Sequence, residues 1–257
     1  MASLTSHTPT VIVVPCFNEA RRLDADAFLG LVRDSAMQLL FVDDGSTDDT
    51  AACLTALCGR SNGRASWFGL PHNVGKAEAV RHGLLRAIEA GAQEVGYLDA
   101  DLATPPEEVQ RLLEVLHART EVEVLIGARV RLLGNGVERR ALRHYLGRIF
   151  ATAASLALAL DIYDTQCGAK LFRVTPQLRD ALAEPFHSRW IFDVELLGRL
   201  AVGRAGVAPV PLHAFAEVPL EVWRDVAGSK VRPGHFLRAA GELADVWMRL
   251  RARRQER

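Results

Sequence analysis

Two aspartates, Asp99 and Asp101, follow a short apolar run in the segment EVGYLDADLATPP. If a strand continues through them, residues i and i+2 point to the same side, so the carboxylates converge while Ala100 points away. Two like charges this close repel each other unless a cation lies between them. Carboxylate oxygens suit Mg²⁺ or Mn²⁺, which keep positions for water and substrate phosphates. The pair therefore predicts a divalent metal site, although a D-x-D pair alone is a weak signal.

Polar residues also close the earlier apolar runs. The first run ends in VVPCFNEA, the second in FVDDGSTDD, and PHNVGKAEA follows the third. Ligands of parallel sheets bind outside the carboxyl ends of the strands. Each segment alone is better explained as a solvated turn before a helix. In FVDDGSTDD, for example, Thr47 or Asp48 could cap the helix that follows. Their coincidence at one sheet edge favours a binding site.

The spacing of apolar residues predicts an α/β protein. Runs rich in β-branched and aromatic residues alternate with segments of helical period, which indicates a mostly parallel sheet with helices on both faces. We expect strands at 10–15, 38–44, 65–70, 94–100 and 122–128, and helices at 75–91 and 105–119. Further along we expect a helix at about 137–160, a strand within 164–174, a helix at 189–201 and a last strand at 205–215. Because no linker or repeat interrupts residues 1–257, a single domain is predicted.

The composition excludes several classes of protein. With 49% hydrophobic and 24% charged residues and a formal net charge of zero, the chain has neither a disordered composition nor a globally basic surface for nucleic acid. Its cysteines form no CxxC pair and no His/Cys ligand set, which predicts reduced thiols. They are Cys16, Cys53, Cys58 and Cys167. The segment MASLTSHTPT lacks the features of a secretory signal, so we expect a cytoplasmic protein.

Two segments bear on membrane contact. The apolar stretch 149–160 has twelve residues, whereas a spanning helix needs about 20. The tail at about 235–254 is predicted to form an amphipathic helix that packs on the domain; the alternative is that it lies on the anionic inner face of a membrane. The predicted apolar face consists of Phe236, Leu237, Ala240, Leu243, Ala244, Trp247 and Leu250.

Several motifs follow one another in the order and spacing of a known family. VVPCFNEA, FVDDGSTDDT, NVGKAEAVRHGL and LDADLATPPEEV resemble glycosyltransferase family 2. DTQCGAKLF, RWIFDVELL and GSKVRP resemble its dolichyl-phosphate (polyprenyl-phosphate) glucosyltransferase branch. The resemblance covers nearly the whole chain. It implies a single-domain GT-A type nucleotide-diphospho-sugar transferase fold, with a nucleotide-sugar half at about 10–130 and an acceptor half at about 131–235.

The resemblance also implies a donor site. Its residues would be Pro15, Asn18, Glu19, Asp44, Gly75, Lys76, Asp99, Ala100 and Asp101. Asp44 would contact the base, Asp99 the ribose or the metal, and Asp101 would ligate Mg²⁺ or Mn²⁺. A solvated lysine is the alternative for Lys76. At the position of Ala103, mannosyl relatives commonly have a glutamine, so this chain resembles the glucosyl branch and offers the metal one fewer protein ligand.

The implied reaction is inverting transfer of a hexose, with UDP-glucose the favoured donor and a polyprenyl phosphate the acceptor. A metal at the departing diphosphate would stabilise its developing charge. An alcohol acceptor needs a general base, for which Asp193 and Asp164 are candidates; helix or turn caps are the alternative for both. A lipid phosphate is already ionised and needs positive charge instead. The candidate cations are Arg129, Arg140, Arg143, Arg224 and Lys230, with solvated arginines as the alternative.

Two other functions remain open at this stage. The same donor chemistry could serve a soluble glycan or small-molecule acceptor. A non-catalytic nucleotide-sugar binder or a receiver-like module could use FVDDGS as an acidic cluster, but receiver domains carry that pair on their first strand and are about half this length. The sequence does not decide the sugar, the nucleotide, the oligomeric state, or which of Asp193 and Asp164 acts as a base.

Overall fold

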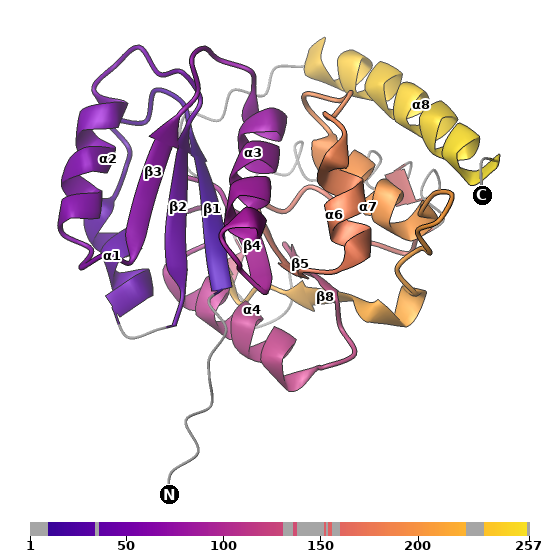
Figure 1. Ribbon diagram of the computed structural model, residues 1–257, viewed down its shortest axis with the longest axis horizontal. Coiled ribbons are helices and arrows are strands. Elements are labelled where there is room, and N and C mark those ends of the chain that lie inside the picture. The colour runs from indigo at the N-terminus through magenta and orange to yellow at the C-terminus, as the bar shows by residue number, and fades with distance from the viewer. Residues whose placement is uncertain are drawn as a thin grey trace, which may run out of the picture.

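A seven-stranded sheet forms the centre of the molecule, with strand order β3-β2-β1-β4-β7-β5-β8 (Figure 1). The computed structural model describes residues 10–33, 36–130, 136–137, 152, 154–155, 160–224 and 234–255. The strands are β1 (Thr10–Cys16), β2 (Gln38–Asp43), β3 (Ala65–Gly69), β4 (Glu94–Leu98), β5 (Val124–Ala128), β7 (Ala169–Arg173) and β8 (Phe215–Pro219). Strand β7 runs antiparallel to β4 and β5, and the other neighbours pair in parallel. The predicted α/β class with a mostly parallel sheet is confirmed.

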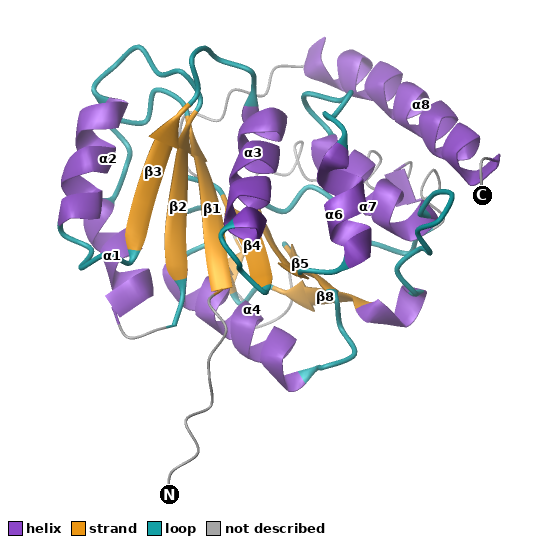
Figure 2. Cartoon of the chain, viewed as in Figure 1, coloured by secondary structure: helices purple, strands orange, loops and turns teal. Residues whose placement is uncertain are grey.

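Helices cover both faces of this sheet (Figure 2). They are α1 (Ala25–Arg33), α2 (Thr50–Gly59), α3 (Lys76–Glu89), α4 (Pro106–Ala118), α6 (Pro176–Ala183), α7 (Phe192–Val202) and α8 (Gly234–Gln255). On one face, Val11 and Val13 pack with α3, α7 and α8. On the other, Ile12 and Val14 pack with α1, α2 and α4. Because successive residues of a strand face opposite sides, covering both faces requires the continuous apolar run seen in β1.

The first four strands along the chain bring four loops to one edge. Strands β1, β2 and β3 are parallel and in register, with Cys16 opposite Asp43 and Asp43 opposite Gly69. Strand β4 lies parallel to β1 on its other side. The loops that follow therefore lie at the same edge of the sheet, as the sequence predicts.

Strand β4 is shorter than predicted. It ends at Leu98, and residues 99–102 form a turn in which Leu102 N donates to Asp99 O at 3.3 Å. The expected convergence of Asp99 and Asp101 by strand alternation is therefore wrong. A tight turn brings the two carboxylates together instead, while Ala100 is buried.

The second half departs further from expectation. The predicted strand at 205–215 is wrong: a 3₁₀ turn, Leu212–Ala214, precedes β8, which begins at Phe215. Pro209 and Pro211 explain this result, because a proline has no N–H to donate to a strand ladder. The helix predicted at 137–160 falls largely outside the described residues, and Val137 lies in strand β6 (Gly136–Val137), which pairs with β9 (Val222–Trp223).

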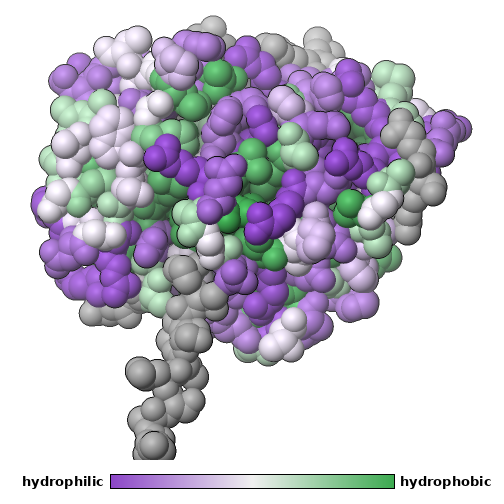
Figure 3. All heavy atoms as spheres, viewed as in Figure 1, coloured by the Kyte–Doolittle hydropathy of each residue, from purple (hydrophilic) through white to green (hydrophobic). Residues whose placement is uncertain are grey.

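Helix α8 packs on the domain, against α7, but with a face partly different from the predicted one (Figure 1). Its buried residues are Ala239, Leu243, Val246 and Leu250. Ala240, Ala244 and Trp247 are exposed instead, and the side chains of Phe236 and Leu237 lie outside the described part of the chain. Among the described helices, none is both long enough and apolar enough to cross a membrane. The face seen in Figure 3 is mainly hydrophilic, with hydrophobic residues in small groups.

Candidate functional site

The loops after β1 and β2 are tied together at the candidate donor edge. Asn18 has a left-handed backbone (φ 54°), and its Oδ1 accepts from Thr47 N at 2.8 Å. Its own N–H donates to Ser46 Oγ at 2.9 Å. Glu19 N donates to Thr50 Oγ1 at 2.8 Å. Pro15, which is half-buried, completes the part of this edge that comes from β1.

The carboxylate of Glu19 is bound by a neighbouring arginine. Arg22 Nε donates to Oε2 at 2.9 Å and its terminal nitrogen donates to Oε1 at 2.6 Å. This bidentate pair stiffens the loop from which Asn18 projects. A direct role of the Glu19 carboxylate at a ribose stays a prediction.

Asp44 holds the turn that leads into α3. Its Oδ1 accepts from Val74 N at 2.8 Å, and its Oδ2 accepts from Gly75 N at 2.9 Å and from Asn73 Nδ2 at 3.0 Å. Burial raises the pKa of Asp44, and the two backbone N–H groups oppose that rise. A carboxylate so bound positions the turn, and a contact with a base would come in addition. Gly75 suits this turn because its φ of 99° is strained for any other residue.

Lys76 begins α3 and faces the aspartate turn. Its Nζ lies 2.6 Å from Asp99 Oδ1 and 5.8 Å from the centroid of the Phe192 ring. Burial lowers the pKa of Lys76, but the charges of Asp99, Asp193 and Asp101 outweigh it, so the pKa is raised. The side chain is 42% exposed, so Lys76 is both solvated and paired with Asp99. The structure thus brings Gly75, Lys76, Asp99 and Asp101 together.

Asp101 is the second carboxylate of this turn. Burial and the charge of Asp99 raise its pKa, while Ala103 N, which donates to Oδ1 at 3.1 Å, lowers it. In the part of the chain that the structure describes, Asp101 belongs to no ion pair, and no cluster contains three His, Cys, Asp or Glu residues placed to hold a metal. A pair of carboxylates still fits Mg²⁺ or Mn²⁺, because such ions commonly take one or two carboxylates and complete their shell with water and phosphate.

The glycine of DTQCG lies directly behind this pair. A Cβ built on Gly168 would come within 2.3 Å of Asp99 Oδ2, so only glycine leaves room for the carboxylate. Gly168 O also accepts from Asp99 N at 3.1 Å. The second half of the chain therefore shapes the turn that carries Asp99 and Asp101.

Asp164 and Arg129 form an ion pair with several hydrogen bonds. Arg129 donates to Asp164 through its backbone N (3.0 Å), Nε (2.6 Å) and a terminal nitrogen (2.7 Å). Burial lowers the pKa of Arg129, but the charge of Asp164 outweighs it and the pKa is raised. Glu217 accepts from Asp164 N at 2.6 Å, and Trp223 lies 5.5 Å below the guanidinium. Two residues predicted to act separately, as base and as phosphate binder, are thus bound to each other.

Asp193 is held in the same way. It is buried at the start of α7, where Lys170 Nζ donates to its Oδ1 at 2.8 Å and the Tyr97 hydroxyl donates to the same oxygen. Lys170 is fully buried on β7 and also donates to Cys167 O at 2.7 Å. Burial and the charge of Asp193 raise the pKa of Tyr97 well above its usual range. A carboxylate that already neutralises a buried lysine is poorly placed to take a proton from an alcohol.

The remaining predicted cations are less well placed. Arg140, Arg143 and Lys230 lie outside the described residues. Arg224 is exposed, and its N–H donates to Ala103 O at 2.9 Å, two residues after Asp101. The backbone of Arg224 therefore lies beside the turn that carries Asp101.

Three contributors were not predicted from sequence. Arg22 stands three residues after Glu19, and this spacing could have indicated the pair. Lys170 is a charge within the apolar run AKLF, which could have signalled a buried ion pair. For Arg189, whose terminal nitrogen donates to Val74 O at 3.1 Å, no local signal exists.

All four cysteines are free. Cys16, at the end of β1, and Cys167, beside Gly168, are both buried. Burial raises the pKa of both thiols, that of Cys167 to about 11. They therefore carry little thiolate at neutral pH and pack as apolar groups.

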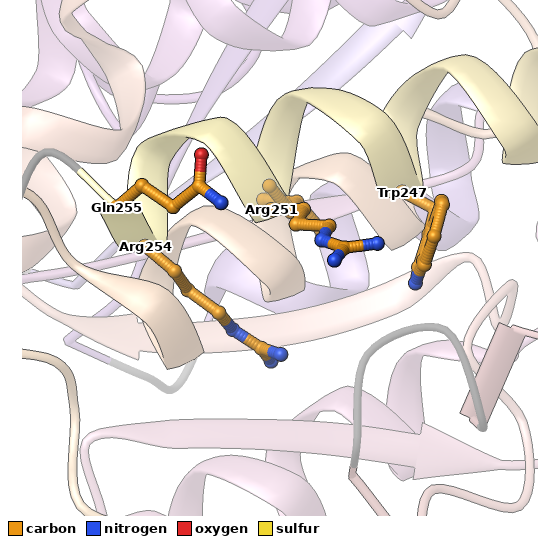
Figure 4. A pocket seen from close by; sticks show the side chains of 5 residues that line it. Trp247, Arg251, Arg254 and Gln255 are labelled. Carbon is orange, nitrogen blue, oxygen red and sulfur yellow. The ribbon is translucent and has the colours of Figure 1, made fainter.

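A pocket of about 350 Å³ is lined by residues of α8 (Figure 4). Its lining residues are Trp247, Leu250, Arg251, Arg254 and Gln255. The Arg251 guanidinium lies 5.5 Å from the centre of the Trp247 ring. The pocket contains none of the predicted donor-site residues, so it does not locate the sugar-transfer chemistry.

A mostly parallel sheet with an acidic pair after β4 fits the GT-A type of glycosyltransferase fold. Comparison with known proteins agrees, since residues 11–177 match the profile of Glycosyl transferase family 2. The chain belongs to this family.

Individual relatives cover most of the chain. A dolichyl-phosphate beta-glucosyltransferase of Trichomonas vaginalis is 29% identical over 96% of this chain and 73% of its own length. That of Saccharomyces cerevisiae is 29% identical over 86% and 68%. A polyprenol monophosphomannose synthase of Mycolicibacterium smegmatis is 26% identical over 88% and 84%.

Solved structures share the fold. Glucosyl-3-phosphoglycerate synthase of Mycobacterium tuberculosis, crystallised with Mn²⁺, UDP-glucose and phosphoglyceric acid, has a TM-score of 0.66 at 19% identity, covering 94% of this chain and 80% of that one. At this identity the likeness establishes the fold. The predicted GT-A architecture is confirmed.

Proposed function

We propose that this protein transfers a hexose, with glucose from UDP-glucose as the favoured donor, to a polyprenyl phosphate, with inversion at the anomeric carbon. The similarity to dolichyl-phosphate glucosyltransferases supports the acceptor class. The observation that carries the proposal is the state of Asp164 and Asp193. Asp164 is bound to the half-buried Arg129 and Asp193 to the buried Lys170, so neither carboxylate serves well as a base.

An anionic acceptor makes a base unnecessary. A phosphate monoester has a second pKa of about 6 and presents an ionised oxygen near neutral pH. That oxygen forms the new bond to the anomeric carbon while the bond from that carbon to the nucleoside diphosphate breaks. No proton has to leave the nucleophile during this step.

The donor edge would hold the nucleotide and the leaving group. Asp101, with Asp99, would hold Mg²⁺ or Mn²⁺ against the diphosphate. When bound, the metal supplies a Lewis acid that neutralises charge on the departing phosphates. Lys76, which pairs with Asp99, would keep a positive charge beside the departing phosphates. Asp44 would set the position of the turn at 73–75 against the base.

The second candidate function keeps the donor and uses a soluble acceptor. One observation favours it: the described helices include none able to cross a membrane, and the lipid would then have to be reached from the surface.

Helix α8 favours a peripheral position on a membrane, because Trp247 and Met248 are exposed beside Arg251 and Arg254. Aromatic and basic side chains together suit an anionic membrane surface.

The test is transfer of radiolabelled glucose from UDP-glucose, with Mn²⁺, to a short-chain polyprenyl phosphate and to a panel of sugars, glycans and phosphorylated metabolites. We expect transfer to the polyprenyl phosphate and none to the dephosphorylated polyprenol. Transfer to a sugar hydroxyl with none to the lipid phosphate would replace this proposal by the soluble-acceptor function. A panel of other nucleotide sugars in the same assay identifies the donor.

A further inference from the structure

The loop at 187–190, just before α7, is held from two sides. From α7, Glu195 accepts from His187 N at 3.0 Å and from Ser188 N at 2.9 Å. From α8, Glu242 Oε2 accepts from Ser188 Oγ at 2.6 Å and from Trp190 N at 3.1 Å. Helix α8 lies beside α7 (Figure 1). The C-terminal helix thus helps to determine the conformation of the residues on either side of Arg189.

This loop carries Arg189 across to the donor edge. Its terminal nitrogen donates to Val74 O at 3.1 Å, and a Cβ at Gly75 would lie 3.5 Å from its Nε, so the guanidinium covers that glycine. Its charge also acts on Asp44, where it opposes the rise in pKa. Arg189 is exposed. A residue 115 positions away in sequence therefore completes the turn at 73–75.

We propose that Arg189 is a donor-binding residue that contacts the nucleoside diphosphate, and that Glu242 is the residue that positions it. This inference rests on the proposed function and adds a residue from the second half to the donor site. With Lys76, it gives the start of α3 two cationic side chains.

The chemistry of the Arg189 guanidinium favours ligand binding over a role limited to its hydrogen bond with Val74. A guanidinium carries five N–H donors, and the bond to Val74 uses one of them. Its planar fork matches phosphate and carbonyl oxygens, and two cations beside a helix start favour an anion. A fixed loop also lowers the entropy lost when the side chain closes on a ligand.

The first measurement is isothermal titration calorimetry of UDP and of UDP-glucose with Mn²⁺, on the wild type, Arg189→Ala and Arg60→Ala. Arg60 is a matched control, an arginine whose side chain is 57% exposed at the end of α2. We expect Arg189→Ala to weaken both ligands by the same factor, about 10- to 100-fold, as for a lost hydrogen bond to a charged group. Arg60→Ala should match the wild type.

The second measurement separates positioning from a general structural role. Glu242→Ala should weaken UDP binding by about fivefold, the effect expected for the loss of one ordinary hydrogen bond. It should have no further effect in the Arg189→Ala background. Glu242→Gln should bind UDP as the wild type does, since both contacts use one oxygen that the amide retains. Thermal unfolding of each variant shows whether it is folded.

The outcomes are distinct. Wild-type affinity in Arg189→Ala would overturn the inference and leave the proposed function intact. So would a loss confined to UDP-glucose, because the contact would then be with the sugar. If Glu242→Ala weakens UDP equally with and without Arg189, the positioning role is wrong. If the wild type binds neither ligand, the proposed function fails, and this inference fails with it.

Discussion

The two edges that flank the candidate reaction centre carry aspartates in opposite states. At the donor edge, burial and the charge of Asp99 raise the pKa of Asp101, and the positive charge of Lys76, which pairs with Asp99, offsets this rise only in part. By contrast, Asp164 and Asp193 each have a cation within 2.8 Å, the half-buried Arg129 and the buried Lys170. A site that must receive a metal keeps negative charge uncompensated, whereas a site that must hold its shape neutralises charge internally. If a metal binds as proposed, this difference favours the donor edge as its site.

The largest effect should come from breaking the acceptor-half pair at Lys170. Lys170→Met leaves Asp193 buried without its cation, which typically costs about 3–5 kcal/mol of folding free energy. Chemical denaturation should show this loss. The double variant Lys170→Met/Asp193→Leu removes both charges and should recover most of it. A single variant as stable as the wild type would show that the pair does not hold this region together.

At the donor edge, Asp101→Asn should instead spare the fold and stop the chemistry. The amide keeps the acceptor for Ala103 N but loses the charge that a metal needs. Metal stabilisation is worth several kcal/mol, so transfer should fall by about 10²- to 10³-fold with Mn²⁺. Asp49→Asn, at an exposed residue on the same edge, is the control. Wild-type turnover in Asp101→Asn would remove this residue from the metal site.

The proposal that neither Asp193 nor Asp164 acts as a base gives the third prediction. Per folded molecule and at saturating donor, Asp193→Asn should keep its transfer rate to polyprenyl phosphate within about tenfold of wild type, whereas loss of a general base costs about 10²- to 10⁴-fold. Asp164→Asn should behave alike. A near-complete loss in Asp193→Asn, in a protein that circular dichroism shows to be folded, would restore the base and favour an alcohol acceptor.

The smallest effect concerns two buried thiols, one at the end of β1 and one beside Gly168. Because burial raises their pKa values, Cys16 and Cys167 should react with iodoacetamide at pH 8 far more slowly than the half-buried Cys53. Adding UDP and Mn²⁺ should slow both thiols further, because Cys16 ends β1 at the donor edge and Cys167 adjoins Gly168, which contacts Asp99. Mass spectrometry of the labelled peptides gives both rates. Protection of neither thiol would mean that the ligands do not close this edge.

The sequence by itself determined the βαβ order of the first half and the edge at which Asn18, Asp44, Lys76 and Asp101 lie. These follow from local rules, because apolar alternation fixes each strand and parallel strands place their carboxyl ends together. It also identified the motifs of the family.

Only the tertiary structure decided which charges compensate each other. Arg129 and Asp164 are 35 residues apart, Lys170 and Asp193 are 23 apart, and Arg189 reaches a carbonyl 115 residues away. The tertiary structure also decided the position of strand β7, which lies antiparallel between β4 and β5. This strand carries Lys170 into the core, and it follows directly on Gly168, whose carbonyl accepts from Asp99 N. A charged residue looks the same in sequence whether solvent or another chain segment will neutralise it, because ion pairing depends on distance in space and on burial.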